Sequence, residues 1–282
     1  MADANAAHHP FVQRLSLSRA CAASRLPLGD IGRPVTAMDL TFASAIGVAA
    51  GFDRHGRLGR QASALGFGFN EIGSLTAADL PRLAISQRGN ARLGLNLTLD
   101  AGRSVDEHHA MLASAWPLAD YLMINLIGPA CAPLLPEQPR LRATLAALRQ
   151  QQTLLDQAGK RRVPLIAKVR CLPGLVPLSL AHSLLELRFD GLLLAHDPGP
   201  PATRQRYLAW QDEQAQQQAC EQIEQLRRLC GDQLTLLSVG GIQTAQHARD
   251  RLEAGARLVQ LYAALQHRGP LAMRRLVSSI EP

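Results

Sequence analysis

The chain has 282 residues, of which 47% are hydrophobic and only 4% aromatic, and its formal charge is +7. This length suffices for one barrel or two small domains, and the composition is typical of a soluble α/β protein with an aliphatic core. No apolar run approaches the roughly 18 residues that span a bilayer, and the first residues lack the pattern of a secretion signal. We therefore expect a cytoplasmic protein, with weak peripheral contact to the inner face of the membrane as the alternative.

The cysteines and the charge narrow the class of ligand. The 5 cysteines form no C-x-x-C pair, so we expect reduced thiols and no metal site. A positive balance favours anionic ligands, whereas scattered arginines and scarce aromatics argue against a nucleic-acid platform. We expect a small anionic substrate and no nucleic-acid partner, and the sequence does not specify the oligomeric state.

Residues 1–35 are predicted to form an N-terminal appendage. The pattern from Phe11 to Arg19 predicts a short basic amphipathic helix, which would cover the barrel, contact a partner or touch a membrane surface. Residues 36–282 then alternate between apolar runs and helical patterns. The predicted strands are residues 45–50, 69–73, 93–97, 121–126, 163–169, 191–195, 234–237 and 258–262. The predicted helices are residues 57–65, 105–115, 140–158, 179–187, 207–229 and 271–280.

Eight predicted strands, each followed by a helix or a long crossover, predict a closed (β/α)₈ TIM barrel. A doubly wound open sheet is the alternative, but it would place its glycine turn after the first strand. Here Gly240 and Gly241 follow the seventh strand. In a barrel, that loop and the next one form the usual phosphate site, because free N–H groups at a helix start suit an anion. An ordinary tight turn is the other interpretation.

Polar side chains end three of the apolar strands. Asn96, Asn125 and Lys168 all fall at predicted carboxyl ends, which meet at one rim of a barrel. Such groups are costly to bury unless a partner satisfies them. Either a ligand contacts them, or the asparagines bond to barrel backbone and the lysine pairs with an acid.

Several segments match one known family at that family's spacing: Met38 to Phe42 with Gly47 to Gly56, Leu65 to Ser74, Ser238 to Ile242, Ala254 to Tyr262, and Arg268 to Pro270. From Pro34 to Ile280 the chain resembles the dihydroorotate dehydrogenase family, nearest its class 2, quinone-using branch.

The resemblance implies a TIM barrel that holds FMN. Lys168 matches a lysine near the N1/O2 edge of the flavin, where a cation stabilises the anionic reduced ring, and Ser74 replaces a threonine near that ring. The residues implied to contact the cofactor are Ala50, Gly51, Ser74, Asn96, Asn125, Lys168, Gly240, Gly241, Tyr262 and Ala263.

The substrate side departs from the family pattern. Gly128 stands where class 2 members have a serine base, and Ala130 replaces an asparagine that would bind orotate. Cys131 is a candidate replacement base, with a small buried thiol as the alternative. His196 is a candidate proton donor, or else an ordinary loop histidine. The implied substrate contacts are Arg54, Asn125, His196 and Asp197.

Loss of a general base costs about 10²–10⁴-fold in rate. We therefore expect an FMN-dependent oxidoreductase that acts on a substrate other than dihydroorotate, because of Gly128. The first alternative is a non-catalytic binding or regulatory homologue. The second is a divergent but authentic dihydroorotate dehydrogenase of pyrimidine biosynthesis.

Overall fold

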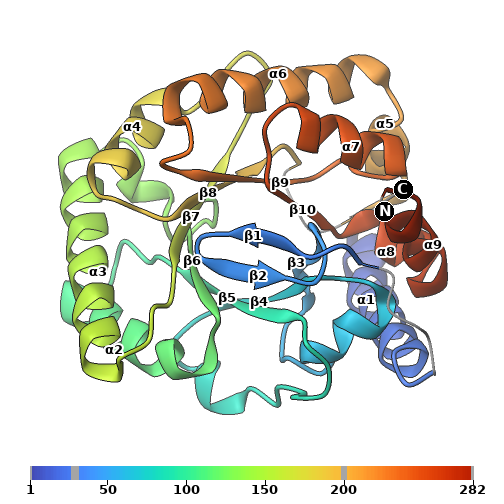
Figure 1. Cartoon of the computed structure of the whole chain (residues 1–282), viewed down its shortest axis with the longest axis horizontal. Helices are drawn as coiled ribbons and strands as arrows, with labels where there is room; N and C mark the ends of the chain where they lie inside the picture. The colour runs from blue at the N-terminus through green and yellow to red at the C-terminus, as the bar shows by residue number, and fades with distance from the viewer. Residues whose placement is uncertain (1, 27–31, 198–201, 281–282) are drawn as a thin grey trace.

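The computed structural model of the chain describes residues 2–26, 32–197 and 202–280, and only the backbone of residues 2–10. Parts of both predicted domains, residues 1–35 and 36–282, therefore lie outside the described residues. Parallel strands close into a barrel in the order β10-β3-β4-β5-β6-β7-β8-β9, surrounded by helices (Figure 1). This arrangement confirms the predicted (β/α)₈ fold.

The barrel strands are aliphatic runs that are buried on both faces. Every residue of β6, β8 and β10 is buried, as expected of a parallel sheet that is covered by helices outside and filled by side chains inside. The barrel strands are β3 (Ile46–Asp53), β4 (Phe69–Leu75), β5 (Arg92–Thr98), β6 (Tyr121–Asn125), β7 (Leu165–Arg170), β8 (Gly191–Ala195), β9 (Thr235–Val239) and β10 (Leu258–Leu261).

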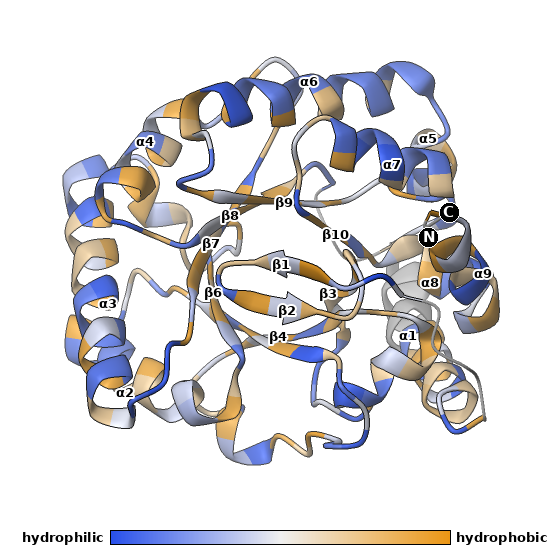
Figure 2. Cartoon of the chain, viewed as in Figure 1, coloured by the Kyte–Doolittle hydropathy of each residue, from blue (hydrophilic) through white to orange (hydrophobic). Residues whose placement is uncertain are grey.

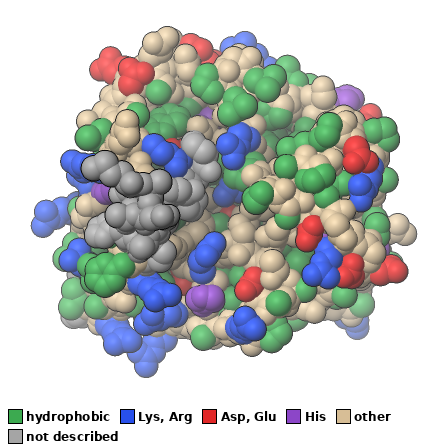
Figure 3. Space-filling view, turned by 180° about the vertical axis from the view of Figure 1, so that it is seen from behind, with side chains coloured by type: hydrophobic (Ala, Val, Ile, Leu, Met, Phe, Trp, Pro, Cys, Tyr) green, Lys and Arg blue, Asp and Glu red, His purple; other side chains and the backbone are tan. Residues whose placement is uncertain are grey.

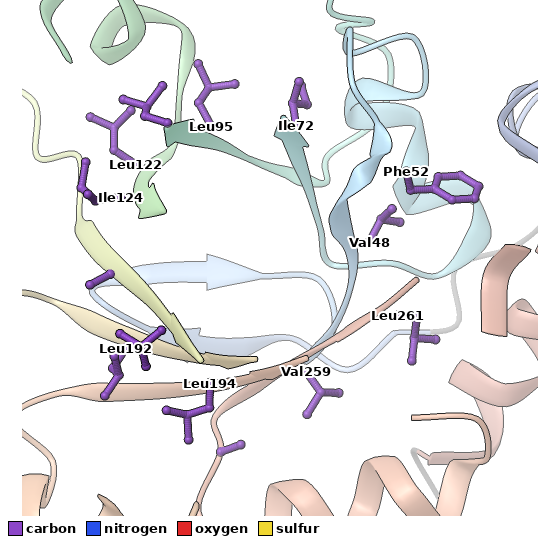
Figure 4. Close-up of a cluster of buried hydrophobic side chains, with 14 of the residues drawn as sticks. Val48, Phe52, Ile72, Leu95, Leu122, Ile124, Leu192, Leu194, Val259 and Leu261 are labelled. Atoms are coloured by element: carbon purple, nitrogen blue, oxygen red, sulfur yellow. The ribbon is translucent and has the colours of Figure 1, made fainter. Parts of the chain in front are cut away.

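The outer layer packs on the outward side chains of the strands. Val48, Ile72 and Leu122 belong to this shell (Figure 4), and the helices keep their polar faces on the outside (Figure 2). The helices are α2 (Val105–Ala115), α3 (Gln138–Gly159), α4 (Leu178–Glu186), α5 (Arg204–Ala209), α6 (Glu213–Cys230), α7 (Ala245–Glu253), α8 (Ala263–Arg268) and α9 (Pro270–Ile280). The 3₁₀ turns are η1 (Gly59–Leu65), η2 (Leu80–Arg82), η3 (Trp116–Leu118) and η4 (Ala132–Leu134).

An antiparallel hairpin, β1 (Val35–Ala37) and β2 (Leu40–Phe42), crosses one end of the barrel (Figure 1). Phe42 is fully buried, and its ring centroid lies 5.5 Å from that of Phe69 and 6.3 Å from that of Tyr121. Those two residues begin β4 and β6, so the hairpin plugs the amino-terminal end. The sequence did not predict it, because both turn residues, Met38 and Asp39, have positive φ, and methionine is not typical of such a turn.

The N-terminal helix α1 (Ala2–Ala23) is longer than the predicted span of residues 11–19. Leu17 and Ala20 are buried, and the helix packs against α8, α9, η1 and β3. Its Gln13 amide donates a hydrogen bond to the carbonyl oxygen of Gly51. The appendage therefore covers the barrel flank beside β3. Within the described residues, no helix has the length and apolar character to cross a membrane.

Two predicted helices differ from the observed elements. In the predicted helix over residues 57–65, only Gly59–Leu65 is helical, and it forms the 3₁₀ segment η1 rather than an α-helix. The predicted helix over residues 207–229 is interrupted between α5 and α6, because Asp212 caps α6 by accepting a hydrogen bond from the Ala215 N–H at 3.2 Å. An aspartate before a helical run is a typical N-cap, so this break had a sequence signal.

Candidate active site

A cavity of about 290 Å³ opens at the carboxyl ends of the strands, at the end of the barrel away from the hairpin. Figure 3 shows this face from outside, with Lys and Arg side chains near its centre. Asn96, Cys131 and His196 are described but do not contribute to the lining. The predicted site residues that do line it are Ala50, Gly51, Arg54, Ser74, Asn125, Lys168, Asp197, Gly240, Gly241, Tyr262 and Ala263.

Lys168 is the buried cation of the cavity wall. It lies near the end of β7 with 8% of its surface exposed. Among the described residues its ammonium donates no hydrogen bond and forms no ion pair. Burial lowers the pKa of Lys168, and the negative charge of Glu71 acts in the opposite direction. A buried ammonium without a direct partner is costly, so this position suits an electron-rich ligand group.

Asn125, in contrast, makes two hydrogen bonds within the protein. Its amide donates to the Ser74 hydroxyl at 2.9 Å, and its carbonyl accepts the Ile127 N–H at 3.0 Å. The side chain therefore holds β4 against the loop after β6. A carboxamide has a second N–H and a second lone pair, which a ligand can use.

Asn96 lies inside the barrel rather than at the cavity. Its amide donates to the Glu71 carboxylate at 2.7 Å, and its carbonyl oxygen has no hydrogen-bond partner among the described residues. Gln260 and Tyr121 donate to the same carboxylate, at 2.6 and 3.4 Å. Residue Asn96 is thus part of a buried network around Glu71.

The Gly240–Gly241 turn requires glycine for two reasons. The φ angles are 103° and 76°, which side chains rarely adopt. In addition, a Cβ on Gly241 would lie 2.1 Å from the Trp210 ring, and one on Gly240 would lie 2.7 Å from the Asp197 backbone nitrogen. The next loop supplies Tyr262, whose hydroxyl is buried without a partner among the described residues and whose pKa burial raises to about 12.

The loop after β6 lacks a proton acceptor at the cavity. Gly128 lines the cavity, and a Cβ added to it would meet no atom within 4 Å. Cys131 is fully buried, and burial raises the pKa of its thiol to about 11. At neutral pH that thiol stays protonated, which is unfavourable for a base.

His196 and Asp197 face different surroundings, because neighbouring residues at a strand end alternate in direction. Asp197 lines the cavity and accepts hydrogen bonds from Arg206 at 2.7 Å and from the Trp210 indole at 2.8 Å. His196 contacts the Gln222 carbonyl oxygen at 2.9 Å instead. Burial lowers the pKa of His196 to about 3, so its ring is neutral at physiological pH.

The sequence did not predict that α5 and Trp210, the residue after it, contribute to the cavity. Arg206, Tyr207 and Trp210 line the cavity, as do Gln243 and Gln260. The only sequence signal for α5 was a pair of N-caps, Thr203 and Asp212, which divide the predicted long helix. Residues 198–201, which precede α5 in the sequence, lie outside the described residues.

Comparison with known proteins identifies the family. Residues 213–282 match the sequence pattern of dihydroorotate dehydrogenase. Over 99% of this chain, a protein of Nocardioides sp. named dihydroorotate dehydrogenase (quinone) is 31% identical, and the match covers 93% of that relative. The chain belongs to the dihydroorotate dehydrogenase family. A Stenotrophomonas maltophilia family member of the same name is 30% identical over 99% of this chain and 92% of its own length.

Solved structures show the same fold for the family. The ligand-free dihydroorotate dehydrogenase of Eimeria tenella superposes with a TM-score of 0.73, covering 96% of this chain and 93% of that one at 22% identity. Its complex with ferulenol gives a TM-score of 0.72 at 21% identity, over 96% of this chain and 90% of that one. The likeness to these structures concerns the barrel and its helices.

Proposed function

We propose that this protein is an FMN-dependent oxidoreductase that acts on a small anionic substrate other than dihydroorotate. The observation that carries the flavin part is Lys168, a buried ammonium in the cavity wall that has no direct partner among the described residues. Membership of the dihydroorotate dehydrogenase family supports the redox chemistry.

The residues of the cavity fit FMN. A reduced flavin carries negative charge at its N1/O2 edge, which Lys168 would stabilise, and a phosphate suits the N–H groups of the Gly240–Gly241 turn. The Tyr262 hydroxyl has no hydrogen-bond partner in the described part of the chain, belongs to the same lining and can donate to an anion. When bound, FMN supplies a hydride acceptor. The chain's own part is to hold it, to place a cation at one edge and to orient the substrate.

The substrate part rests on the missing base. Among the described lining residues, the Ser74 hydroxyl accepts a hydrogen bond from Asn125. Each carboxylate oxygen of Asp197 also accepts one, from Arg206 and from the Trp210 indole. Gly128 carries no functional group. Arg54 lines the cavity with an exposed guanidinium and no hydrogen bond or ion pair among the described residues, which favours an anionic substrate.

A second candidate function is authentic dihydroorotate oxidation. The observation that favours it is the name shared by the relatives from Nocardioides sp. and Stenotrophomonas maltophilia, each at least 30% identical over 99% of this chain. It requires a base, which Gly128 and the protonated Cys131 thiol do not offer.

The visible spectrum of the purified protein tests the flavin proposal, and anaerobic mixing with dihydroorotate tests the substrate. We expect a flavin spectrum, or its appearance when FMN is added to the colourless protein. We then expect reduction by dihydroorotate to be slow. A protein that FMN cannot reconstitute contradicts the flavin proposal, and prompt bleaching by dihydroorotate favours the second candidate.

A further inference from the structure

Arg251 is a cation buried completely in the outer layer behind the Gly240–Gly241 turn. It lies on α7 with 0% of its surface exposed. Burial lowers the pKa of its guanidinium to about 10, which still leaves it charged at neutral pH. A guanidinium removed from water is destabilising unless an opposite charge compensates it.

The described neighbours of Arg251 supply little of that opposite charge. The Cys220 sulfur is a hydrogen-bond partner of the guanidinium, and the negative charge of Asp250 acts on it without a direct ion pair. Nη2 donates to the Gln216 carbonyl oxygen at 2.7 Å, and Nη1 lies 3.5 Å from the Ser238 hydroxyl. The guanidinium carbon lies 6.0 Å from the centroid of the Trp210 ring. Within the described residues, Nε has no partner and no acidic residue forms an ion pair with Arg251.

One side chain connects Arg251 to the turn. The amide of Gln216 donates to the carbonyl oxygens of Gly241, at 2.8 Å, and of Trp210, at 2.7 Å. Because Arg251 holds the other end of that amide, it determines the orientation in which Gln216 supports the turn. The Trp210 ring that Arg251 faces is the same ring that contacts Gly241.

We propose that Arg251 is a positioning residue that acts through Gln216 on the Gly240–Gly241 turn and supplies the buried charge that a phosphate group there compensates. This inference rests on the proposed FMN function and names a new contributor to it. Arg251 does not line the cavity, so its effect on a ligand is exerted through the turn and through the electrostatic field, which falls off slowly in a dry interior.

Titration of the cofactor-free protein with FMN and with riboflavin, which lacks the phosphate, separates charge from structure. We expect Arg251→Met to weaken FMN binding by about tenfold or more and to change riboflavin binding by less than about twofold. Arg251→Lys keeps the charge and should retain most of the FMN affinity. Equal losses for both ligands, or undiminished FMN binding in Arg251→Met, would overturn the inference.

If Arg251→Met does not fold, a second pair of variants tests whether the charge of Arg251 supports FMN binding. Ser238→Asp places a carboxylate beside the intact guanidinium and neutralises it, and Ser238→Asn is the uncharged control of similar size. FMN affinity should fall in the aspartate variant relative to the asparagine variant, while riboflavin affinity stays the same in both. Equal FMN affinities in the two variants contradict the inference. A wild-type protein that binds neither ligand contradicts the proposed function itself.

Discussion

Two pairs of polar groups in the cavity wall differ in how far the protein already engages them. Lys168, near the end of β7, and the Tyr262 hydroxyl, after β10, have no hydrogen-bond partner among the described residues. Asn125, at the end of β6, and Asp197, after β8, already bond to protein groups. The two pairs are interleaved around the rim, because β7 lies between β6 and β8 in the barrel. Unmet polar groups indicate where a ligand belongs, whereas engaged ones indicate structure. We therefore expect the first pair to contact a ligand and the second pair to hold the wall together.

The largest effect is expected at Gly128, because one substitution there would add the hydroxyl group that the family's serine base carries. A Cβ at this position meets no atom within 4 Å, and its φ lies outside the positive region. Gly128→Ser should therefore fit and speed flavin reduction by dihydroorotate by about 10²–10⁴-fold, the usual contribution of a base. Stopped-flow absorbance measures the rate, with Gly128→Ala as the control. Equal rates in the two variants would mean that the cavity lacks further groups needed for dihydroorotate oxidation besides the base.

Substitution of Lys168 tests whether this buried ammonium contacts the flavin. Lys168→Met keeps the length of the side chain and removes the charge, so we expect flavin reduction to slow by about 10²-fold, because the developing negative charge loses its cation. Reduction by dithionite under anaerobic conditions and a redox titration report the effect without a natural substrate. Lys168→Arg is the charged control. An unchanged potential in Lys168→Met would show that the lysine is structural.

His196 lies outside the cavity lining, and its buried ring makes a prediction about acid stability. Burial lowers the pKa of His196 from its ordinary value of 6.5 to about 3. Between these two pH values the histidine is protonated in the unfolded chain but not in the folded protein. The histidine therefore lowers the free energy of unfolding by about 1.4 kcal/mol per pH unit between about pH 6.5 and 3. His196→Asn should remove this slope, a difference of about 2 kcal/mol at pH 5 in urea unfolding. A change in flavin reduction rather than in acid stability would place His196 in the chemistry.

The smallest effect is expected at Cys131. Because its thiol is buried with a raised pKa of about 11, Cys131→Ala should change the rate of flavin reduction by less than about twofold and cost about 1 kcal/mol of stability. Rate and urea midpoint are measured on the same preparation. A rate loss above about tenfold that follows a titration near neutral pH would identify the thiol as a base after all.

Much of the fold was predictable because it depends on local pattern. Aliphatic runs that end in polar or glycine residues predicted the eight barrel strands within a few residues, and the span 191–195 was matched at both ends. The hairpin of β1 and β2 was not predicted, because its turn at Met38 and Asp39 lacks the usual residues. Its position is determined by Phe42, which packs against Phe69 and Tyr121, two residues that are far from it in the sequence.

By itself the sequence determined the barrel and the rim at which polar strand ends meet, because period, glycine turns and strand ends are local properties. The tertiary structure alone decided which polar side chains reach the cavity. Asn96 bonds to Glu71 inside the barrel. His196 contacts Gln222 outside the cavity lining, whereas Asp197 lines the cavity. Trp210 reaches Gly241 from a segment 31 positions earlier in the chain. Such outcomes depend on long-range packing, which no local pattern encodes.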